Sequence, residues 1–259
     1  MDIDIEALKT IAKQAGEAIM EIYGEDDFAV EMKDDKSPLT AADKASHEVI
    51  VAGLRKHFPD IPILSEEGAD IPYEERKNWQ RFWLVDPLDG TKEFIKRAGE
   101  FTVNIALIEN QTPVIGVVYV PVQEKMYSGI VGTGAWLEAK ALTLKPQASS
   151  LKPLHVRSID PERGLTVVMS RSHPSPELEE YLKGINVAEA LPVGSSLKLC
   201  VVAEGTADLY PRLGPTMEWD TAAGHAVVVA AGGRVETSEG EPLRYNKEKL
   251  LNPFFVVSA

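Results

Sequence analysis

The sequence predicts an α/β protein, with a mixed α+β first half and a second half in which strands and helices alternate. Three observations support this fold class. Two helical patterns open the chain, apolar runs of strand length follow them, and short strand-like and helix-like segments alternate after the polar stretch Lys145–Pro153. At about 100–200 residues per domain, the 259 residues fit two modest domains, which we predict to be residues 1–148 and 149–259.

The two helices of the first half are predicted from apolar spacing and from end signals. Apolar residues recur three and four positions apart over Ile5–Ile19, and Gly24 ends this pattern. The second helix is predicted over Ala41–His57, because Phe58-Pro59 follows it and the residue before a proline disfavours the helical conformation.

The strands of the first half are short apolar runs, of which Thr102–Ile108 and Val114–Val120 flank a polar stretch typical of a hairpin. Two earlier runs, Ile61–Ser65 and Phe82–Asp86, are also predicted to be strands. In the second half we expect strands over Val167–Ser170, Ala207–Arg212 and Phe254–Ser258, and helices over Glu177–Lys183, Ser195–Ala203 and Thr221–Ala231.

Composition excludes several classes of protein. The 27 Lys and Arg residues against 40 Asp and Glu residues give a net charge of −13, which argues against a nucleic-acid partner. Cys200 is the single cysteine, so a disulfide framework is excluded and a reducing cytoplasm fits. The N-terminal residues show no signal peptide, and no apolar run reaches the ~18 residues of a membrane span. We therefore expect a cytoplasmic protein with no transmembrane segment.

The stretch Trp83–Thr91 is the most informative for chemistry. It predicts a buried strand that ends at Asp86, a turn at Pro87, and then Asp89-Gly90-Thr91. Carboxylates next to apolar residues cost free energy unless a cation compensates them, and Mg²⁺ prefers oxygen ligands, which here include the Leu88 carbonyl. A helix beginning at Gly90-Thr91 would offer free N–H groups to a phosphate oxygen. The alternative is an ordinary turn in which both aspartates cap the backbone.

Further acidic residues extend this pattern. Glu66-Glu67 follows a short apolar run, and Asp220 directly precedes an apolar helix. Each has a simpler interpretation, an exposed turn for the first and a helix N-cap for the second. Together with Asp86 and Asp89 they match a two-metal phosphoryl-transfer site. Asp43, near the start of the second helix, could pair with the Thr91 hydroxyl to deprotonate a water, although spacing alone does not determine this pairing.

Three of these motifs, Glu66-Glu67, Asp86–Thr91 and Trp219–Gly224, resemble the signature set of the lithium-sensitive, magnesium-dependent inositol monophosphatase superfamily, in order and over the whole chain. The resemblance implies the layered α-β-α-β-α fold of these sugar phosphatases. The CysQ-type 3'(2'),5'-bisphosphate nucleotidases, a subfamily, are more similar still. The motifs that carry the subfamily resemblance are Asp89–Arg97, Gly99–Ile108, Ser170–His173 and Gly194–Cys200. Inositol monophosphatases usually have Asp-Gly-Thr-Thr-Asn-Phe where this chain has Asp-Gly-Thr-Lys-Glu-Phe.

The resemblance also implies roles for individual residues. One Mg²⁺ would be held by Glu66, Asp86 and the Leu88 carbonyl, and a second by Asp86, Asp89 and Asp220. A third, weaker metal near Glu66 is an option of the family, with Asp35 near its water shell. Thr91, backed by Asp43, would activate the attacking water, and the Gly90 and Thr91 amides would hold the scissile phosphate.

The same resemblance places nucleotide recognition in the second half, at His173, Ser195, Lys198 and Arg212. Ser195 and Lys198 would share one face if they lie on a helix. Lys198 and Arg212 would supply positive charge for the phosphate that is not hydrolysed. The alternatives are that Lys198 is a solvated helix residue and that Arg212 pairs with Glu218 or a neighbour. Cys200 and His225, which lie among apolar residues, are interpreted as packing residues.

The expected activity is Mg²⁺-dependent hydrolysis of the 3'-phosphate of adenosine 3',5'-bisphosphate. The resemblance adds 3'-phosphoadenosine 5'-phosphosulfate as a second substrate and a role in sulfate assimilation. The alternatives are a phosphatase for inositol or other sugar phosphates and, more distantly, a non-catalytic sensor of a metal–nucleotide complex. Family analogy leaves peripheral association with the cell membrane open, and the sequence does not determine the oligomeric state.

Overall fold

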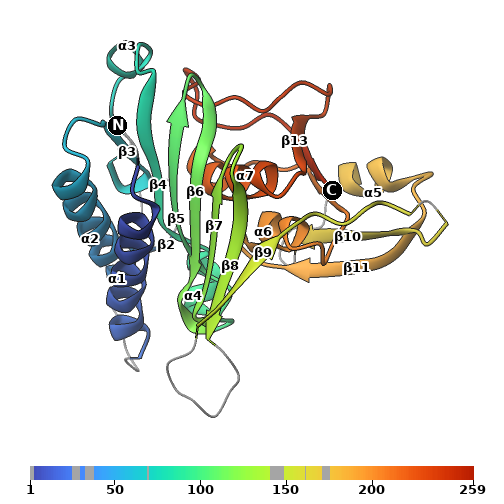
Figure 1. The fold of residues 1–259 in the computed structure, drawn as a ribbon, viewed down its shortest axis with the longest axis horizontal. Coiled ribbons are helices and arrows are strands. Elements are labelled where there is room, and N and C mark those ends of the chain that lie inside the picture. The colour runs from blue at the N-terminus through green and yellow to red at the C-terminus, as the bar shows by residue number, and fades with distance from the viewer. Residues whose placement is uncertain are drawn as a thin grey trace.

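The computed structural model of the protein describes residues 3–24, 30–32, 38–68, 70–140, 149–160, 162–170 and 176–259. Within this part of the chain a long mixed sheet has the strand order β3-β4-β5-β6-β7-β8-β9 (Figure 1). Only β3 and β4 run parallel, and the other neighbours are antiparallel. The strands are β3 (Ile63–Ser65), β4 (Arg81–Asp89), β5 (Thr102–Glu109), β6 (Thr112–Val120), β7 (Lys125–Ile130), β8 (Gly134–Lys140) and β9 (Ser149–Leu154).

Helices α1 (Ile5–Tyr23) and α2 (Ala41–His57) pack together on one face of this sheet (Figure 1). Asp4 caps α1, because its carboxylate accepts a hydrogen bond from the Glu6 amide at 3.0 Å. The buried stripe of α1 contacts β5 and β6, and α2 contacts β4. Both helices therefore form where apolar spacing predicts them. In the chain, α1 and α2 are separated by the short strands β1 (Val30–Met32) and β2 (Pro38–Thr40), which pair antiparallel.

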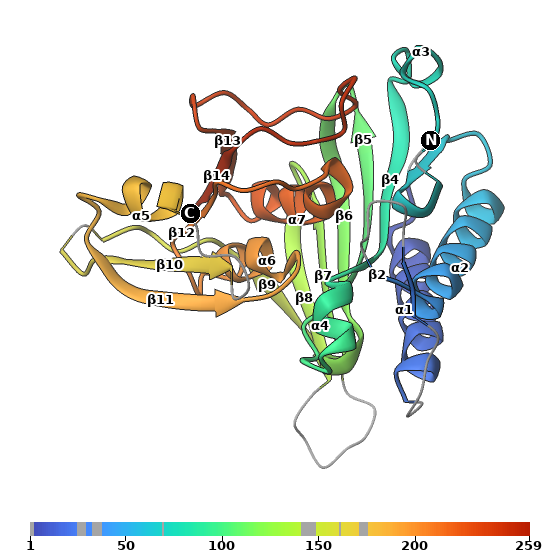
Figure 2. The ribbon, with the colours of Figure 1, turned by 180° about the vertical axis from the view of Figure 1, so that it is seen from behind.

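The other face of the sheet is covered by α7 (Glu218–Ala230), against which α6 (Leu197–Ala203) packs (Figure 2). Close approach requires small residues in the sheet. A Cβ at Gly116 of β6 would stand 2.1 Å from the Ala223 carbonyl oxygen of α7, so only glycine fits there. The sheet and α7 thus pack almost backbone to backbone.

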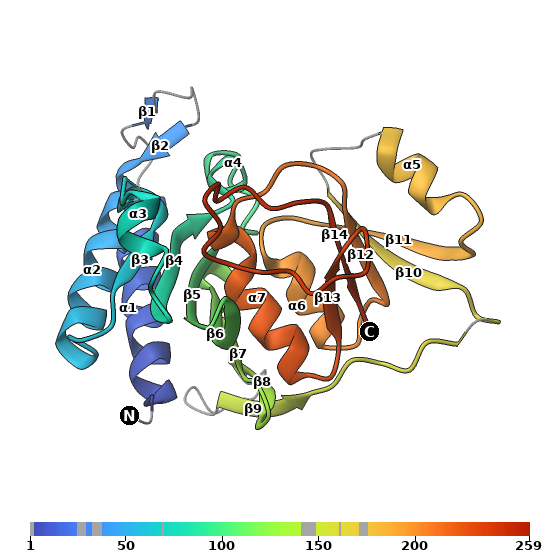
Figure 3. The same cartoon turned by 90° about the horizontal axis from the view of Figure 1, so that it is seen from above.

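A second sheet lies on the far side of α6 and α7, and in the described residues its order is β11-β10-β12-β14-β13 (Figures 2 and 3). β10 runs parallel to β11 and β12, whereas β14 is antiparallel to β12 and β13. The strands are β10 (Leu165–Ser170), β11 (Val187–Val193), β12 (Leu209–Arg212), β13 (Arg234–Thr237) and β14 (Phe255–Ser258). The helix α5 (Pro176–Leu182) lies outside this sheet (Figure 3).

From above, the molecule shows the layers α1/α2, long sheet, α6/α7, second sheet and α5 (Figure 3). Two apolar cores separate these layers, one between α1/α2 and the long sheet and the other between the two sheets around α7. The predicted fold class and the α-β-α-β-α layering are confirmed. The predicted hairpin is also confirmed, since β5 pairs with β6 from Val103 to Glu109.

Several predicted boundaries differ from the structure. β9 follows the predicted domain boundary, yet it pairs with β8 at the edge of the long sheet. The division at residues 148 and 149 therefore stays a prediction. β4 does not end at Asp86 but continues to Asp89, and α7 begins at Glu218 rather than Thr221. In the part of the chain that the structure describes, none of the helices is both long and apolar enough to cross a membrane.

Candidate active site

A bulge in β4 brings Asp86 and Asp89 to the same face of the long sheet. Asp86 lies opposite Asn104 of β5 and Asp89 lies opposite Thr102, so the four residues 86–89 of β4 span the same length as the three residues 102–104 of β5. A bulge of this kind adds a residue to one strand and re-aims the side chains that follow it. Leu88, within the bulge, packs into the core on the α1/α2 side instead. The predicted turn after Asp86 is thus a bulge inside a strand, and the bulge carries two candidate metal ligands.

Asp86 is buried, with 1% of its surface exposed, and accepts a hydrogen bond from the Leu88 amide at 3.1 Å. Burial raises its pKa well above the ordinary value. The charges of Glu66, Asp89, Asp220 and Asp43 raise the pKa further. The structure therefore brings together five of the acidic residues that the sequence selected, whereas Asp35 lies outside the described residues.

Asp89 keeps part of its surface exposed, yet protein surrounds it closely. Burial raises its pKa to about 6, although Lys198 and a hydrogen bond from the Ser196 amide oppose the rise. Gly90, the next residue, has φ 91°, and a Cβ there would stand 3.3 Å from the Ser195 Cβ. Glycine is therefore suited to this turn on both counts.

Asp220 is the third residue of α7, and its carboxylate accepts a hydrogen bond from the Met217 amide at 2.9 Å. Burial and the charge of Asp89 raise its pKa to about 8. The alternative in which Asp220 is the N-cap and Thr221 begins the helix is wrong. Met217 is the N-cap, and Asp220 closes the capping box from inside the first turn.

Glu66, Asp43 and Thr91 surround the bulge from three different elements. Glu66 is half-buried and opens the short 3-10 helix η1 (Glu66–Gly68), which follows β3 directly. Asp43 is buried in the first turn of α2, and Ser46, three residues later, donates a hydrogen bond to the Pro87 carbonyl at 2.7 Å. Sequence reasoning missed Ser46, for which the only signal is its helical spacing from Asp43. This bond fastens α2 to the bulge.

The Thr91 hydroxyl donates to the Leu88 carbonyl at 3.4 Å, and Thr91 is the first residue of α4 (Thr91–Ile95). A long bond of this kind leaves the hydroxyl able to take another partner. The pairing of Thr91 with Asp43 stays a prediction. A short helix does begin at this point, at Thr91.

The second half contributes Lys198, Ser195 and Arg212. Lys198 is buried rather than solvated, and its ammonium donates to the Ser195 carbonyl at 2.6 Å. Burial lowers its pKa, and the charge of Asp89 opposes this. Ser195 precedes α6 with φ 47°, so the two residues do not share a helical face as predicted. His173 lies outside the described residues.

Arg212, at the end of β12, donates to the Pro215 carbonyl at 2.7 Å. It lowers the pKa of Asp220 and of Lys198, which places its charge beside both. The alternative pairing of Arg212 with Glu218 is wrong, because Glu218 is buried at the start of α7 and bound to Lys247. The bond to the Pro215 carbonyl fits the other alternative, pairing with a neighbour, while the charge of Arg212 acts on Asp220 and Lys198.

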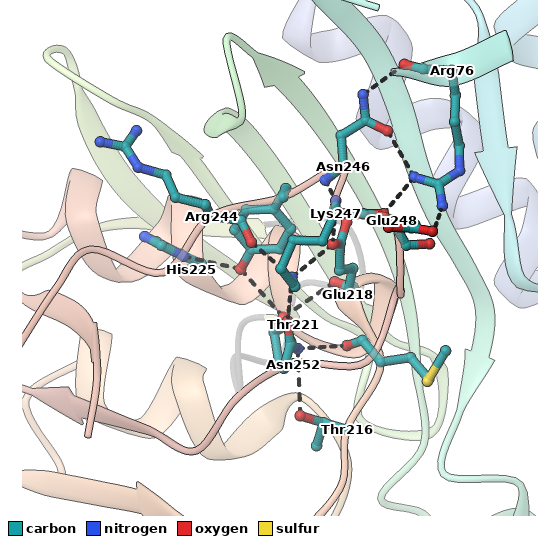
Figure 4. Close-up of polar contacts among 12 residues, drawn as sticks. Arg76, Thr216, Glu218, Thr221, His225, Arg244, Asn246, Lys247, Glu248 and Asn252 are labelled. Carbon is teal, nitrogen blue, oxygen red and sulfur yellow. Dashed lines mark hydrogen bonds and ion pairs between the residues drawn. The ribbon is translucent and has the colours of Figure 1, made fainter. Parts of the chain in front are cut away.

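Glu218 anchors the N-terminus of α7 and, with it, Asp220. Its carboxylate accepts from the Asn246 amide at 2.6 Å, the Lys247 amide at 3.0 Å and the Lys247 ammonium at 2.6 Å (Figure 4). Asn252 donates to the Met217 carbonyl at 2.8 Å, and Asn246 exchanges hydrogen bonds with Arg76 of α3 (Tyr73–Arg76). Sequence reasoning did not predict this network, because its members lie far apart in the chain.

Cys200 and His225 are confirmed as packing residues. Cys200 is fully buried. His225 forms a 2.9 Å hydrogen bond between its Nδ1 and the Tyr245 hydroxyl, and burial lowers its pKa to about 3. A neutral histidine that is hydrogen-bonded to Tyr245 inside the protein has a structural role.

The acidic residues fit a divalent cation by charge and by donor type. In the described part of the chain, no group of three or more His, Cys, Asp or Glu side chains is arranged so that it could hold a metal ion as it stands. Asp86, Asp89 and Asp220 instead accept hydrogen bonds from backbone amides while raising one another's pKa. Carboxylate oxygens that repel one another at the carboxyl end of a buried strand are a donor set that a hard cation would stabilise.

The layers and this acidic site, set between the long sheet and α7, define a layered α/β protein with a candidate phosphoryl-transfer centre. The chain belongs to the inositol monophosphatase family, which matches residues 2–253.

Among its relatives is the 3'(2'),5'-bisphosphate nucleotidase CysQ of Escherichia coli O6:H1, which is 54% identical over 96% of both chains. The protein of the same name from Haemophilus influenzae is 37% identical over 95% of this chain and 89% of its own. The crystal structure of CysQ from Bacteroides thetaiotaomicron superposes with a TM-score of 0.84 at 49% identity, covering 98% of this chain and 96% of that chain. The chain is thus similar to its nucleotidase relatives over nearly its whole length.

Proposed function

We propose that the chain is a Mg²⁺-dependent 3'(2'),5'-bisphosphate nucleotidase, which hydrolyses the 3'-phosphate of adenosine 3',5'-bisphosphate to AMP and inorganic phosphate. The observation that carries this proposal is a cluster of carboxylates that repel one another beside the buried cation of Lys198. The carboxylates suit metal ions that bind one phosphate, and the fixed positive charge suits a second phosphate. The relatives named 3'(2'),5'-bisphosphate nucleotidase support this substrate class.

For the metal ions we assign the ligands as follows. Glu66, Asp86 and the Leu88 carbonyl hold one Mg²⁺, and Asp86, Asp89 and Asp220 hold a second, with Asp86 shared. The pKa shifts of Asp86, Asp89 and Asp220 support this assignment, since each carboxylate responds to its neighbours' charges. When bound, the ions neutralise charge on the transferring phosphoryl group and acidify water. A third ion near Glu66 is an outcome that a metal titration would reveal.

The attacking water is oriented by Thr91 Oγ1, and Asp43 accepts its proton. The Gly90 and Thr91 amides hold the scissile phosphate. The water oxygen forms the new P–O bond while the bond from phosphorus to the nucleoside 3'-oxygen breaks, and that oxygen takes a proton from a solvent water as it leaves. The anchoring of α2 through Ser46 to the Pro87 carbonyl supports this arrangement, because it fixes the helix that carries Asp43 against the bulge.

Nucleotide recognition falls to Lys198, Arg212, Ser195 and His173. Lys198 and Arg212 bind the phosphate that remains on the product. The burial of Lys198 and its bond to the Ser195 carbonyl support this role, because a fixed ammonium discriminates better than a solvated one. The pyrophosphate-like 5' group of 3'-phosphoadenosine 5'-phosphosulfate would meet the same cations. We therefore include this compound as a second substrate and propose a role in clearing the bisphosphate by-product of sulfate assimilation.

Comparative hydrolysis tests the substrate. The proposal predicts a higher kcat/KM for adenosine 3',5'-bisphosphate than for inositol 1-phosphate, with no turnover after the metal is removed by EDTA. A higher value for the inositol ester would make the chain an inositol monophosphatase. Tight binding of the metal and nucleotide without any turnover would make it a sensor. The exposed variant Glu180→Gln is the matched control, since Glu180 lies on the outer helix α5 and should leave every rate unchanged.

A further inference from the structure

Three neutral polar side chains, Thr102, Asn104 and Ser196, form a buried cluster beside Asp89. Ser196 Oγ donates to Asn104 Oδ1 at 2.7 Å and lies 2.8 Å from Thr102 Oγ1. Because the Ser196 hydroxyl proton points to Asn104, the Thr102 hydroxyl donates to Ser196 Oγ. At most 2% of each of the three residues is exposed. None of them belongs to the ligand and substrate sets assigned above.

The strand register places this cluster against both candidate metal ligands of β4. Thr102 lies directly opposite Asp89, and Asn104 lies directly opposite Asp86. Side chains of directly opposed residues share a face of the sheet and stand about 4.5–5.5 Å apart at Cβ. The bulge in β4 is what allows both aspartates to face Thr102 and Asn104. The cluster and the two carboxylates therefore form one continuous polar layer.

Ser196 connects this layer to the second half of the chain. Its backbone N–H donates to Asp89 Oδ2, while its hydroxyl is held by the two β5 side chains. The neighbouring Gly194 amide donates to Glu100 Oε2 at 2.8 Å, and Lys198 donates to the Ser195 carbonyl at 2.6 Å. The turn 194–196 is thus held at Gly194 by Glu100 and at Ser196 by the long sheet, and its middle residue Ser195 binds Lys198.

We propose that Ser196, held in place by Thr102 and Asn104, is a positioning residue that presents Asp89 to the divalent cation and couples the metal site to the Lys198 pocket. The Ser196 N–H occupies Oδ2 of Asp89 and leaves Oδ1 for the cation. This inference rests on the proposed function for the identity of the ligand. It deepens that function by assigning a supporting shell to one metal ligand.

The chemistry of the cluster favours positioning over simple packing. Buried hydroxyl and amide groups cost free energy unless they are bonded, and apolar side chains of similar shape would fill the space without that cost. The two hydroxyls and Asn104 Oδ1 are bonded to one another, whereas Asn104 Nδ2 has no hydrogen-bond partner within the described residues. The bonded groups fix the position of Ser196 against the sheet. Partners behind a metal ligand typically change metal affinity 10–100-fold when they are removed.

The test measures Mg²⁺ binding by calorimetric titration of EDTA-stripped protein, without substrate. We expect Ser196→Ala and Thr102→Val each to weaken the affinity of the Asp89 site by about 10-fold or more. Thr102→Ser should recover most of the affinity lost in Thr102→Val, because it restores the hydroxyl. Ser128→Ala is the matched control and should bind as wild type, since Ser128 is a buried serine of β7 outside this cluster.

Wild-type affinity in both Ser196→Ala and Thr102→Val would overturn the inference. Equal losses in Thr102→Ser and Thr102→Val would also overturn it, because the hydroxyl would then not be the cause. Thermal unfolding in EDTA identifies any variant that fails to fold. If Ser196→Ala fails to fold, the comparison of Thr102→Val with Thr102→Ser decides the test. The titration needs no nucleotide. An inactive wild type would therefore contradict the proposed function and leave the inference on Ser196 to its own outcome.

Discussion

Two regions of the molecule that enclose carboxylates differ in how the charge is compensated. Asp208, fully buried beside β12, accepts hydrogen bonds from Arg157 Nε at 2.5 Å, Arg163 at 3.0 Å and the Thr166 amide at 2.7 Å. Burial alone would raise its pKa, but these donors and the two arginine charges hold the pKa below its ordinary value. Asp208 is therefore neutralised by the protein itself.

The acidic site beside the bulge lacks this internal compensation. Burial and neighbouring carboxylates raise the pKa of Asp86, Asp89 and Asp220. Lys198 and Arg212 oppose the shifts only in part. This difference shows that burial alone does not identify a functional carboxylate. A functional carboxylate is identified by burial together with too few protein cations around it. The remaining charge is left to a ligand from solution.

The largest expected effect comes from removing one carboxylate of the uncompensated region. Asp89→Asn should lower kcat/KM for adenosine 3',5'-bisphosphate by about 10³-fold, roughly 4 kcal/mol of lost transition-state stabilisation. The amide still accepts a hydrogen bond from the Ser196 N–H, so the fold should be kept. Steady-state kinetics and thermal unfolding of the same sample check both statements. Turnover within a few-fold of wild type would remove Asp89 from the site.

The next effect is on stability, at the anchor of α7. Glu218→Ala should cost about 3 kcal/mol of unfolding free energy, because it leaves the Lys247 ammonium and the Asn246 and Lys247 amides without their acceptor. Urea unfolding measures this cost. Glu180→Ala removes an exposed ion pair with Lys183 and should change the free energy by less than about 0.5 kcal/mol. Equal costs in the two variants would contradict the anchoring role.

Neutralising one carboxylate of each region in metal-free protein should change the unfolding free energy with opposite signs. Asp208→Asn should destabilise by about 2 kcal/mol, since it weakens charged hydrogen bonds to Arg157 and Arg163. Asp220→Asn should stabilise by about 1 kcal/mol at pH 8.5, because it removes repulsion. Thermal unfolding in EDTA decides this, and two shifts of the same sign would break the comparison.

The pH dependence of that stability follows from the raised pKa values. Unfolded Asp220 titrates near 3.8, and the folded group titrates at about 8. Its contribution is therefore full below pH 3.8 and is lost as the pH rises through 8. Between pH 6 and 9, metal-free wild type should lose at least about 1 kcal/mol more than Asp220→Asn, a shift of roughly 3 °C. Parallel pH profiles for the two proteins would show that Asp220 does not titrate there.

The last expected effect concerns substrate selectivity. Lys198→Met removes the buried ammonium while keeping the length of the side chain. We expect kcat/KM for adenosine 3',5'-bisphosphate to fall about 10-fold more than kcat/KM for a nucleoside monophosphate. Only the bisphosphate has a second phosphate for the Lys198 ammonium to bind. Equal losses on both substrates would assign Lys198 to the metal site or to packing instead.

Local sequence patterns predicted the helices α1 and α2, the hairpin of β5 and β6, and the acidic residues around Asp86. These features depend on spacing within a short segment. The bulge that places Asp86 and Asp89 on one face was not predicted, because it depends on pairing with β5. The same holds for Ser196, whose partners Thr102 and Asn104 lie 94 and 92 positions away. Contacts between residues far apart in the chain leave no pattern in the local sequence.

The central claim is that Lys198 and Arg212 compensate the carboxylates beside the bulge only in part, so that these carboxylates require a divalent cation. Proton release on Mg²⁺ binding tests it most directly, measured by titrating EDTA-stripped protein at pH 7 in two buffers with different ionisation enthalpies. At this pH part of the Asp89 and Asp220 population carries a proton, which a bound cation must displace. We predict that Mg²⁺ binds with net proton release and that the release is smaller in Asp220→Asn. Binding with the same heat in both buffers, or no binding, would contradict it.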